Sequence, residues 1–129
     1  MRRDELAALA QEFEQARPLL EQALAKDTTN TWTMDAIRDR VMMGDVQLWH
    51  NPRYAAITEV INYPQRRVVL VHLASGELDA IVQAYEDLEK FARIVEATGI
   101  EINGRKGWTR VLKDRGFNEV AVRLFKGVR

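Results

Sequence analysis

Near the end of this chain several cationic residues flank a tryptophan, and these residue types are suited to binding a ligand. The cluster consists of Arg105, Lys106, Arg110, Lys113 and Arg115, with Trp108 among them. Guanidinium and ammonium groups bind phosphates, and an indole ring can stack on a base. The alternative is a solvated helix face that turns Trp108 into the core, with one cation pairing with Glu101 as a structural lock. We take Arg105, Lys106, Trp108 and Arg110 as candidate interaction residues for a protein partner.

The composition of the chain excludes several kinds of site. There is no cysteine, which excludes thiolate nucleophiles, disulfides and cysteine–zinc centres. His50 and His72 are the only histidines. No metal-ligand spacing, Ser-His-Asp arrangement or P-loop is visible, so we expect no metal site. The 19 basic and 19 acidic residues give zero net charge, which argues against nucleic acid or an anionic membrane as partner.

Length and hydropathy predict one domain with a sizeable core. The longest apolar run, Val68–Ala74, is interrupted by His72 and is too short to cross a bilayer. The first residues, Met-Arg-Arg-Asp-Glu, lack the apolar stretch of a signal peptide. We therefore expect a cytoplasmic protein without membrane contact.

A long amphipathic helix is predicted at the N-terminus. Apolar residues recur every three or four positions from Leu6 to Leu24, which indicates a helix over residues 4–26. Pro18 lies inside this pattern and removes a backbone donor, so we expect a kink or a division into two helices. Residues 1–17 form a helical extension whose apolar stripe packs either on the domain's own sheet or on a partner.

The remaining pattern predicts an α+β domain, a mixed sheet covered by helices. Thr33 as N-cap and Gly44 as C-cap bound a second helix over residues 34–43. Then follow strands over residues 46–50, 55–63 and 67–73, a long helix over 77–98, a strand over 99–103, a short helix over 106–114, and a last strand through Val120, Val122 and Leu124.

This order, α-α-β-β-β-α-β-α-β, resembles the GNAT N-acetyltransferase superfamily without its first strand. The matching details are Ala92-Arg93 late in the long helix, the strand Gly99-Ile100-Glu101-Ile102, and Gly116-Phe117 after the basic helix. The segments TEVINYPQRR (58–67) and GRKGWTRVLKDRGF (104–117) are similar to small bacteriophage-encoded GNAT-like proteins. The resemblance implies a single GNAT-like domain over residues 1–129.

In this superfamily a glycine-rich loop before the long helix binds the diphosphate of acyl-CoA, through backbone N–H groups at the helix N-terminus. The corresponding residues here are Ser75, Gly76, Glu77 and Leu78. Glu77 and Asp79 bring two carboxylates to that place, which would repel a phosphate. Leu112 stands where many members have the tyrosine that protonates the departing thiolate.

Members of the superfamily often deprotonate the amine with a glutamate on a central strand. By this resemblance, Glu59 and His72 are the candidate bases. The alternative for each residue is a purely structural role, with Glu59 as a half-buried or sheet-edge carboxylate and His72 as a hydrogen-bonded histidine of the core.

Four aromatic residues lie around the same strands and either line a ligand cleft or anchor the core or an interface. They are Trp32, Trp49, Tyr54 and Tyr63.

On balance, the missing glycines, the two acids and Leu112 favour a non-catalytic GNAT-fold protein of phage origin, acting as a structural or interaction component of a virion or its assembly. This hypothesis requires no cofactor. It implies protein partners, such as phage structural proteins or a second copy, in the host cytoplasm or the virion. The alternative is an acyl-CoA-dependent N-acetyltransferase with a degenerate cofactor loop, which would take acetyl-CoA.

Overall fold

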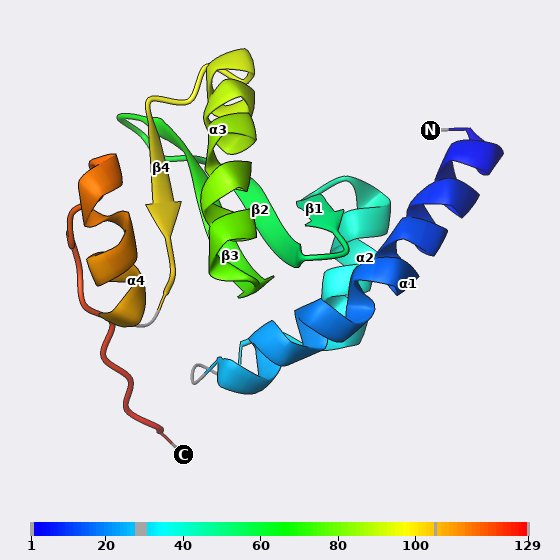
Figure 1. Cartoon of the computed structure of the whole chain (residues 1–129), viewed down its shortest axis with the longest axis horizontal. Coiled ribbons are helices and arrows are strands. Elements are labelled where there is room, and N and C mark those ends of the chain that lie inside the picture. The colour runs from blue at the N-terminus through cyan, green and yellow to red at the C-terminus, as the bar shows by residue number, and fades with distance from the viewer. Residues whose placement is uncertain (1, 28–30, 105, 129) are drawn as a thin grey trace.

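The computed structural model describes residues 2–27, 31–104 and 106–128 (Figure 1). The elements in chain order are α1 (Arg3–Lys26), α2 (Met34–Met43), β1 (Gln47–Asn51), β2 (Tyr54–Asn62), β3 (Arg67–Gly76), α3 (Leu78–Ile94), β4 (Gly99–Ile102), α4 (Lys106–Leu112) and the 3-10 helix η1 (Lys113–Arg115). No helix among these described ranges is long and apolar enough to span a bilayer.

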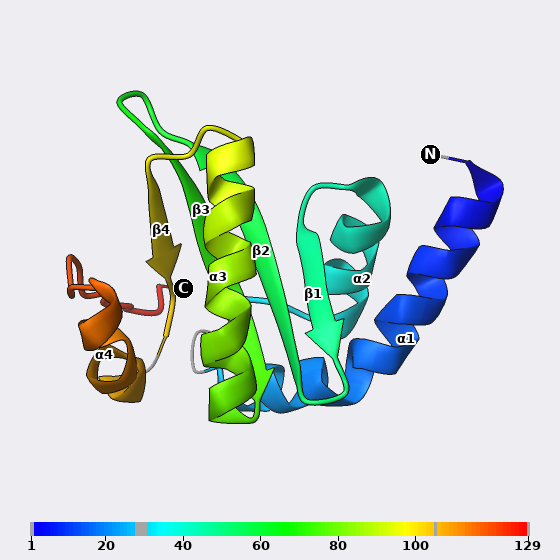
Figure 2. The same cartoon turned by 45° about the horizontal axis from the view of Figure 1, so that its top comes forward.

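The four strands form one mixed sheet in the order β1-β2-β3-β4. β1 pairs antiparallel with β2, and β2 with β3, whereas β4 runs parallel to β3 after the α3 crossover. Figures 1 and 2 show α3 on one face of the sheet, with α1 and α2 on the other. The predicted α+β class is confirmed.

The main core lies between α1, α2 and the sheet. Phe13 and Leu20 come from α1, Ile37 from α2, and Ile57 and Leu73 from the sheet, and each is at most 6% exposed. Full burial of such a side chain stabilises the fold by about 1.5–3 kcal/mol. The apolar stripe of α1 therefore packs on the domain's own sheet.

Pro18 lies inside α1, which is one helix from end to end. Figure 2 shows that the axis of α1 changes direction part-way along its length. A proline within a helix removes a backbone hydrogen bond and clashes with the preceding turn, which bends the axis. Of the two outcomes expected from Pro18, the structure shows the kink and not the division.

Both predicted caps of α2 are confirmed. The Thr33 hydroxyl oxygen accepts a hydrogen bond from the Ala36 N–H at 3.1 Å. Gly44 ends the helix at φ 80°, and its N–H donates to the Val41 carbonyl at 3.1 Å. These contacts satisfy backbone groups that a helix leaves without a partner at its ends.

A half-buried polar chain lies on the α3 face of the sheet. Trp49 Nε1 donates to Thr58 Oγ1 at 2.9 Å, and that hydroxyl donates to Gln47 Oε1 at 2.8 Å. The Trp49 indole meets the Phe91 ring of α3 edge-on, with the ring centroids 5.4 Å apart. Trp49 therefore anchors α3 to the sheet, because its polar N–H is satisfied while its rings are packed.

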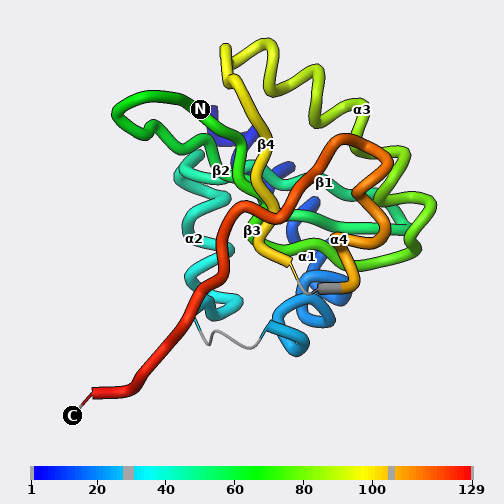
Figure 3. Tube along the Cα trace, turned by 90° about the vertical axis from the view of Figure 1, so that its left-hand side faces the viewer, coloured from blue at the N-terminus to red at the C-terminus, as the bar shows by residue number. Residues whose placement is uncertain are grey.

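The last predicted strand does not form. Residues 117–128 follow η1 without helix or strand structure, and the end of this segment runs away from the domain (Figures 1 and 3). Val120, Val122 and Leu124 are 80%, 73% and 93% exposed. Their alternation suits a strand, but a strand also needs a neighbouring strand with which it exchanges hydrogen bonds, and this segment pairs with none of the strands of the described residues. The prediction of a closing strand is wrong for this reason.

Candidate functional site

The sheet opens between β3 and β4. These strands pair over Val68–Val71 and Gly99–Ile102, and the Asn103 N–H donates one further bond to the Val71 carbonyl at 3.1 Å. Beyond that point β3 continues to Gly76 and is paired with β2. A cleft of about 970 Å³ lies at the opening.

Both faces of the sheet contribute to the wall of this cleft. Trp32 and His72 line it from the α1–α2 side, and Ile81 and Tyr85 line it from α3. Residues 117–123 of the C-terminal segment line it as well. Its volume is in the range of small-molecule sites in proteins.

A bulge in β3 sets the position of His72. The β2–β3 register shifts between Ile57, which pairs with Leu73, and Thr58, which pairs with Val71. His72 is the extra residue in this stretch. A bulge re-aims the side chain that it carries. Leu73 packs in the core beneath α1, and both Leu73 and His72 line the cleft.

His72 and Glu59 form a hydrogen-bonded pair. The distance between His72 Nε2 and Glu59 Oε1 is 2.7 Å, and the two side chains are 12% and 21% exposed. In the tautomer that donates Nε2–H to the carboxylate, Nδ1 keeps its lone pair and can accept a proton. The sequence offered the two residues as alternative bases, and the structure joins them in one unit.

Trp32 and Arg40 complete the surroundings of this pair. The Trp32 and His72 rings meet edge-on with centroids 5.0 Å apart. The Arg40 guanidinium lies 5.3 Å from the centroid of the Trp32 ring, and its Nη1 is 3.7 Å from Glu59 Oε2. The sequence analysis missed Arg40, because no local pattern links a residue of α2 to a carboxylate on β2.

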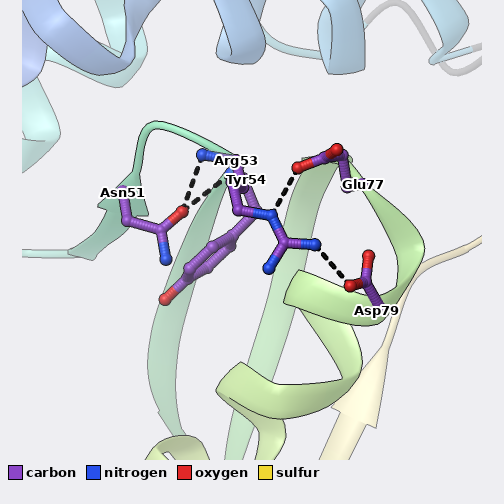
Figure 4. Close-up of polar contacts among 5 residues, drawn as sticks. All are labelled: Asn51, Arg53, Tyr54, Glu77 and Asp79. Atoms are coloured by element: carbon purple, nitrogen blue, oxygen red, sulfur yellow. Dashed lines mark hydrogen bonds and ion pairs between the residues drawn. The ribbon is translucent and has the colours of Figure 1, made fainter.

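Arg53, in the β1–β2 turn, contacts both acids at the start of α3 (Figure 4). Its Nε lies 2.5 Å from Glu77 Oε2, and its Nη2 donates to Asp79 Oδ2. Its backbone carbonyl accepts a bond from the Glu77 N–H at 2.8 Å. The Asn51 Oδ1 atom fixes the turn by accepting from the N–H groups of Arg53 at 2.8 Å and Tyr54 at 3.1 Å.

This contact changes the expected electrostatics of the α3 N-terminus. The hydrogen bond from Arg53 lowers the pKa of the Asp79 carboxyl, and the bonds to Asp79 and Glu77 raise the pKa of Arg53. One guanidinium thus offsets part of the charge of two carboxylates, and the predicted repulsion of a phosphate is weaker than two unpaired acids would cause. Tertiary folding brings Arg53 here, so no local motif could mark it.

Gly76 permits the close approach of the β1–β2 turn to α3. Its φ is 131°, and a Cβ atom there would lie 2.3 Å from the Arg53 carbonyl oxygen. We expect Gly76→Ala to lower the free energy of unfolding by about 2–3 kcal/mol, because backbone must move. Urea denaturation followed by circular dichroism measures this.

Gly107→Ala is the matched control, because a Cβ at Gly107 meets no atom within 4 Å. It should leave the free energy of unfolding unchanged or raise it by up to about 1 kcal/mol, because alanine favours a helix more than glycine does. Equal stability of the Gly76→Ala and Gly107→Ala variants would contradict the close contact.

A second cavity, of about 360 Å³, lies beside the start of α3. Three of the predicted cofactor residues, Ser75, Gly76 and Leu78, line it together with Trp108 and the cation Lys26. Glu77, the fourth predicted residue, is instead held by Arg53. The second cavity and the larger cleft share four lining residues, so the two adjoin.

The predicted interaction residues of the basic segment take different positions. Arg105 lies outside the described residues, and Lys106 begins α4. Trp108 is half-buried and lines both cavities, while Arg110 is exposed. Glu101, the carboxylate of the predicted lock, accepts a hydrogen bond at its Oε1 from Arg66 of the β2–β3 turn at 2.9 Å.

The Gly-Phe segment after η1 packs the end of α4 against α3. Leu112 is 5% exposed, and its carbonyl accepts from the Phe117 N–H at 3.4 Å. The Phe117 and Tyr85 rings meet edge-on with centroids 5.6 Å apart. Leu112 therefore has a packing role.

Of the aromatic residues that the sequence placed around the strands, Tyr54 is buried. Tyr63 is 44% exposed, and its hydroxyl oxygen lies 3.5 Å from Glu101 Oε2.

Comparisons with known proteins agree with this architecture. No protein-family model and no curated protein matches the chain. A solved tetramutant of protein BH1408 from Bacillus halodurans superimposes with a TM-score of 0.68 at 9% identity, over 92% of this chain and 96% of that one. Aminoglycoside N-acetyltransferase AAC(6')-Iy, in complex with CoA, gives 0.67 at 13% identity, over 92% and 90%.

The fold is GNAT-like. An aminoglycoside acetyltransferase from an uncultured soil metagenomic sample, in complex with trehalose, gives a TM-score of 0.63 at 8% identity, over 93% of this chain and 90% of that one. The GNAT-like architecture predicted from the order of elements is confirmed. At these identities the likeness establishes the fold and not the chemistry, which depends on the residues of the site.

Proposed function

We propose that this protein is an acyl-CoA-dependent N-acyltransferase. The observation that carries the proposal is the hydrogen-bonded Glu59–His72 pair at the cleft where β3 and β4 separate. Acylation of an amine releases a proton, and a carboxylate–imidazole pair is suited to accept it. A fold alone does not confer activity, so this pair, and not the architecture, is the argument.

The two side chains have distinct roles in this proposal. His72 lines the cleft and takes the proton from the acceptor amine, which frees the nitrogen lone pair for attack on the acyl carbon. Glu59 holds the imidazole in one orientation and stabilises the positive charge that forms on it. Trp32 packs against the imidazole ring, and Arg40 contacts the far oxygen of Glu59, so the pair has support on both sides.

The smaller cavity is the place proposed for the phosphate and pantetheine portions of acyl-CoA, whose thioester supplies the activated acyl group. Ser75, Gly76 and Leu78 would border the diphosphate, and Lys26 would supply positive charge. The carboxylates of Glu77 and Asp79 are engaged by Arg53. The residues that line this cavity are therefore compatible with an anionic ligand.

The competing hypothesis is the non-catalytic interaction protein that the sequence favours. Its support was the pair of acids at the start of α3, the missing glycines in the loop before that helix, and the leucine at position 112. Arg53 weakens the first of these arguments, because it binds both acids. Structural likeness to acetyltransferases fits the enzyme hypothesis better, and no comparison supports a phage or virion role.

Calorimetric titration with acetyl-CoA and with CoA tests the proposal. We expect dissociation constants in the micromolar range. Leu78→Glu should weaken binding at least about tenfold, because it places a carboxylate beside the cavity proposed for the phosphates. Ile94→Glu is the matched control, since Leu78 and Ile94 are both exposed apolar residues of α3, at 50% and 79%, at opposite ends of the helix.

Two results would overturn the proposal. One is the absence of heat and of thermal stabilisation at millimolar acetyl-CoA, which would favour the interaction protein. The other is binding that Leu78→Glu and Ile94→Glu weaken equally, because the ligand would then lie away from the start of α3.

A further inference from the structure

The wall of the larger cleft holds many of the aromatic side chains of this protein. All three tryptophans of the chain and two of its three tyrosines line the cleft, together with Phe117. They are Trp32, Trp49, Trp108, Tyr54 and Tyr85. Apart from Tyr54, which is buried, these residues are half-buried and keep part of their surface in contact with solvent. Apolar surface of this kind in a concave site is suited to an apolar ligand.

The C-terminal segment adds aliphatic side chains to the same wall. Val120 and Val122 line the cleft, although they are 80% and 73% exposed. The segment is fixed at its start by Phe117, whose ring meets Tyr85 edge-on with the centroids 5.6 Å apart. An apolar body in the cleft would take surface of the two valines out of water, and this removal favours binding.

The charged side chains of the cleft carry no excess of negative charge. Apart from His72, the described residues that line it include three carboxylates and three cations. The carboxylates are Asp27, Glu101 and Glu119, and the cations are Lys26, Arg66 and Arg123. One pair is in direct contact, since Arg66 donates to Glu101 Oε1 at 2.9 Å. A ligand with several ammonium groups therefore gains little from this cleft by charge complementarity.

Two guanidinium groups already lie near aromatic rings of the cleft wall. The Arg40 guanidinium lies 5.3 Å from the centroid of the Trp32 ring. The Arg115 guanidinium lies 5.9 Å from the centroid of the Tyr85 ring. A further cation at either ring would be repelled by the guanidinium, whereas a neutral ring meets no such repulsion. The aromatic surface of the cleft therefore favours an aromatic body over a second ammonium group.

We propose that the acceptor of this protein is a primary monoamine with an aromatic body, and not a polycation. The inference rests on the proposed function, since it places the amine nitrogen beside His72 and the ring near Tyr85 and Val122. One amino group is enough for the reaction. Its nitrogen bonds to the acyl carbon, the thioester C–S bond breaks, and CoA leaves as a thiolate while His72 takes the proton that the nitrogen loses.

Ligand titrations of the full chain, followed by tryptophan fluorescence, test the proposal without requiring turnover. All three tryptophans line the cleft, so their emission reports its occupation. The probes are 4-phenylbutylamine, butylamine and kanamycin, each with and without CoA, which carries no acyl group. We expect 4-phenylbutylamine to bind at least about tenfold more tightly than butylamine, from which it differs by the ring alone. The same margin is expected over kanamycin, an aminoglycoside with several amino groups.

Val120→Asp with Val122→Asp should reduce the preference for 4-phenylbutylamine over kanamycin at least about tenfold, because two carboxylates replace apolar surface in the wall. Leu124→Asp with Val128→Asp is the matched control. Leu124 and Val128 belong to the same segment and are 93% and 88% exposed, but they lie beyond Arg123, the last described residue of the wall. The control variant should keep the preference of the unchanged chain.

Three results would overturn the proposal. They are binding of 4-phenylbutylamine no tighter than that of butylamine, binding of kanamycin as tight as that of 4-phenylbutylamine, and equal changes of preference in the two double variants. Calorimetry with acetyl-CoA separates this proposal from the proposed function. Binding of acetyl-CoA without a preference for the ring would overturn the amine class alone. Binding of 4-phenylbutylamine without binding of acetyl-CoA would overturn the acyltransferase, and with it the role of the amine as acceptor, but not the amine site.

Discussion

His72→Ala should lower kcat/KM for amine acylation by about 10²–10⁴-fold, the usual contribution of a positioned general base. The loss should appear in kcat, while the affinity for CoA measured by calorimetry should stay within about threefold of the original. The reason is that His72 lies on the bulge of β3 in the larger cleft, whereas the proposed CoA cavity is lined by Ser75, Gly76 and Leu78. A coupled assay for free thiol, with a panel of primary amines, measures the rate.

Glu59→Gln should lower the rate by a similar factor, because the amide cannot stabilise a positive imidazole as a carboxylate does. The double variant Glu59→Gln with His72→Ala should be little worse than either single variant, since residues that act as a unit are not additive.

His50→Ala is the matched control, as His50 is the other histidine of the chain and contacts Glu12 of α1 at 3.8 Å. It should retain full activity. If the His72→Ala variant were as active as the His50→Ala variant, His72 would not be the base. Binding of CoA would then be tested separately, by calorimetry.

Phe13→Ala should lower the free energy of unfolding by about 3–5 kcal/mol, the range for truncating a buried aromatic ring. Phe13 is fully buried and belongs to the core that joins α1 to Ile57 and Leu73 of the sheet. The Arg17 guanidinium also lies 5.3 Å from the centroid of its ring. Urea denaturation followed by tryptophan fluorescence and by circular dichroism should show one shared transition at lower midpoint.

Ile94→Ala serves as the control for this measurement, since Ile94 is a large side chain that is 79% exposed at the end of α3. It should change stability by less than about 0.5 kcal/mol. If Phe13→Ala were equally mild, the N-terminal half of α1 would not belong to the cooperative core. Its stripe would then be free for the partner contact that the sequence left open.

Local patterns predicted most of the elements because helix and strand periods and caps are properties of neighbouring residues. Thr33 and Gly44 bound α2 as expected, and Pro18 bends α1, because each acts within one turn of helix. The order of strands and helices, through its resemblance to the GNAT superfamily, predicted the GNAT-like fold, although the closing strand of that order does not form. Residues 117–128 show the limit of such patterns, because alternation is a property of one segment, whereas a strand requires a second segment with which it pairs.

The sequence by itself therefore determined the class of fold and the apolar stripe of α1, and through the resemblance it offered two candidate bases. Only the tertiary structure decided that Glu59 and His72 act on each other, because a bulge in β3 and the β2–β3 register bring together residues 13 positions apart. The tertiary structure also decided the charge at the start of α3, because Arg53 binds Glu77 and Asp79, which lie 24 and 26 positions further along the chain. Such contacts depend on the path of the chain through space, and the spacing of residues along it does not encode them locally.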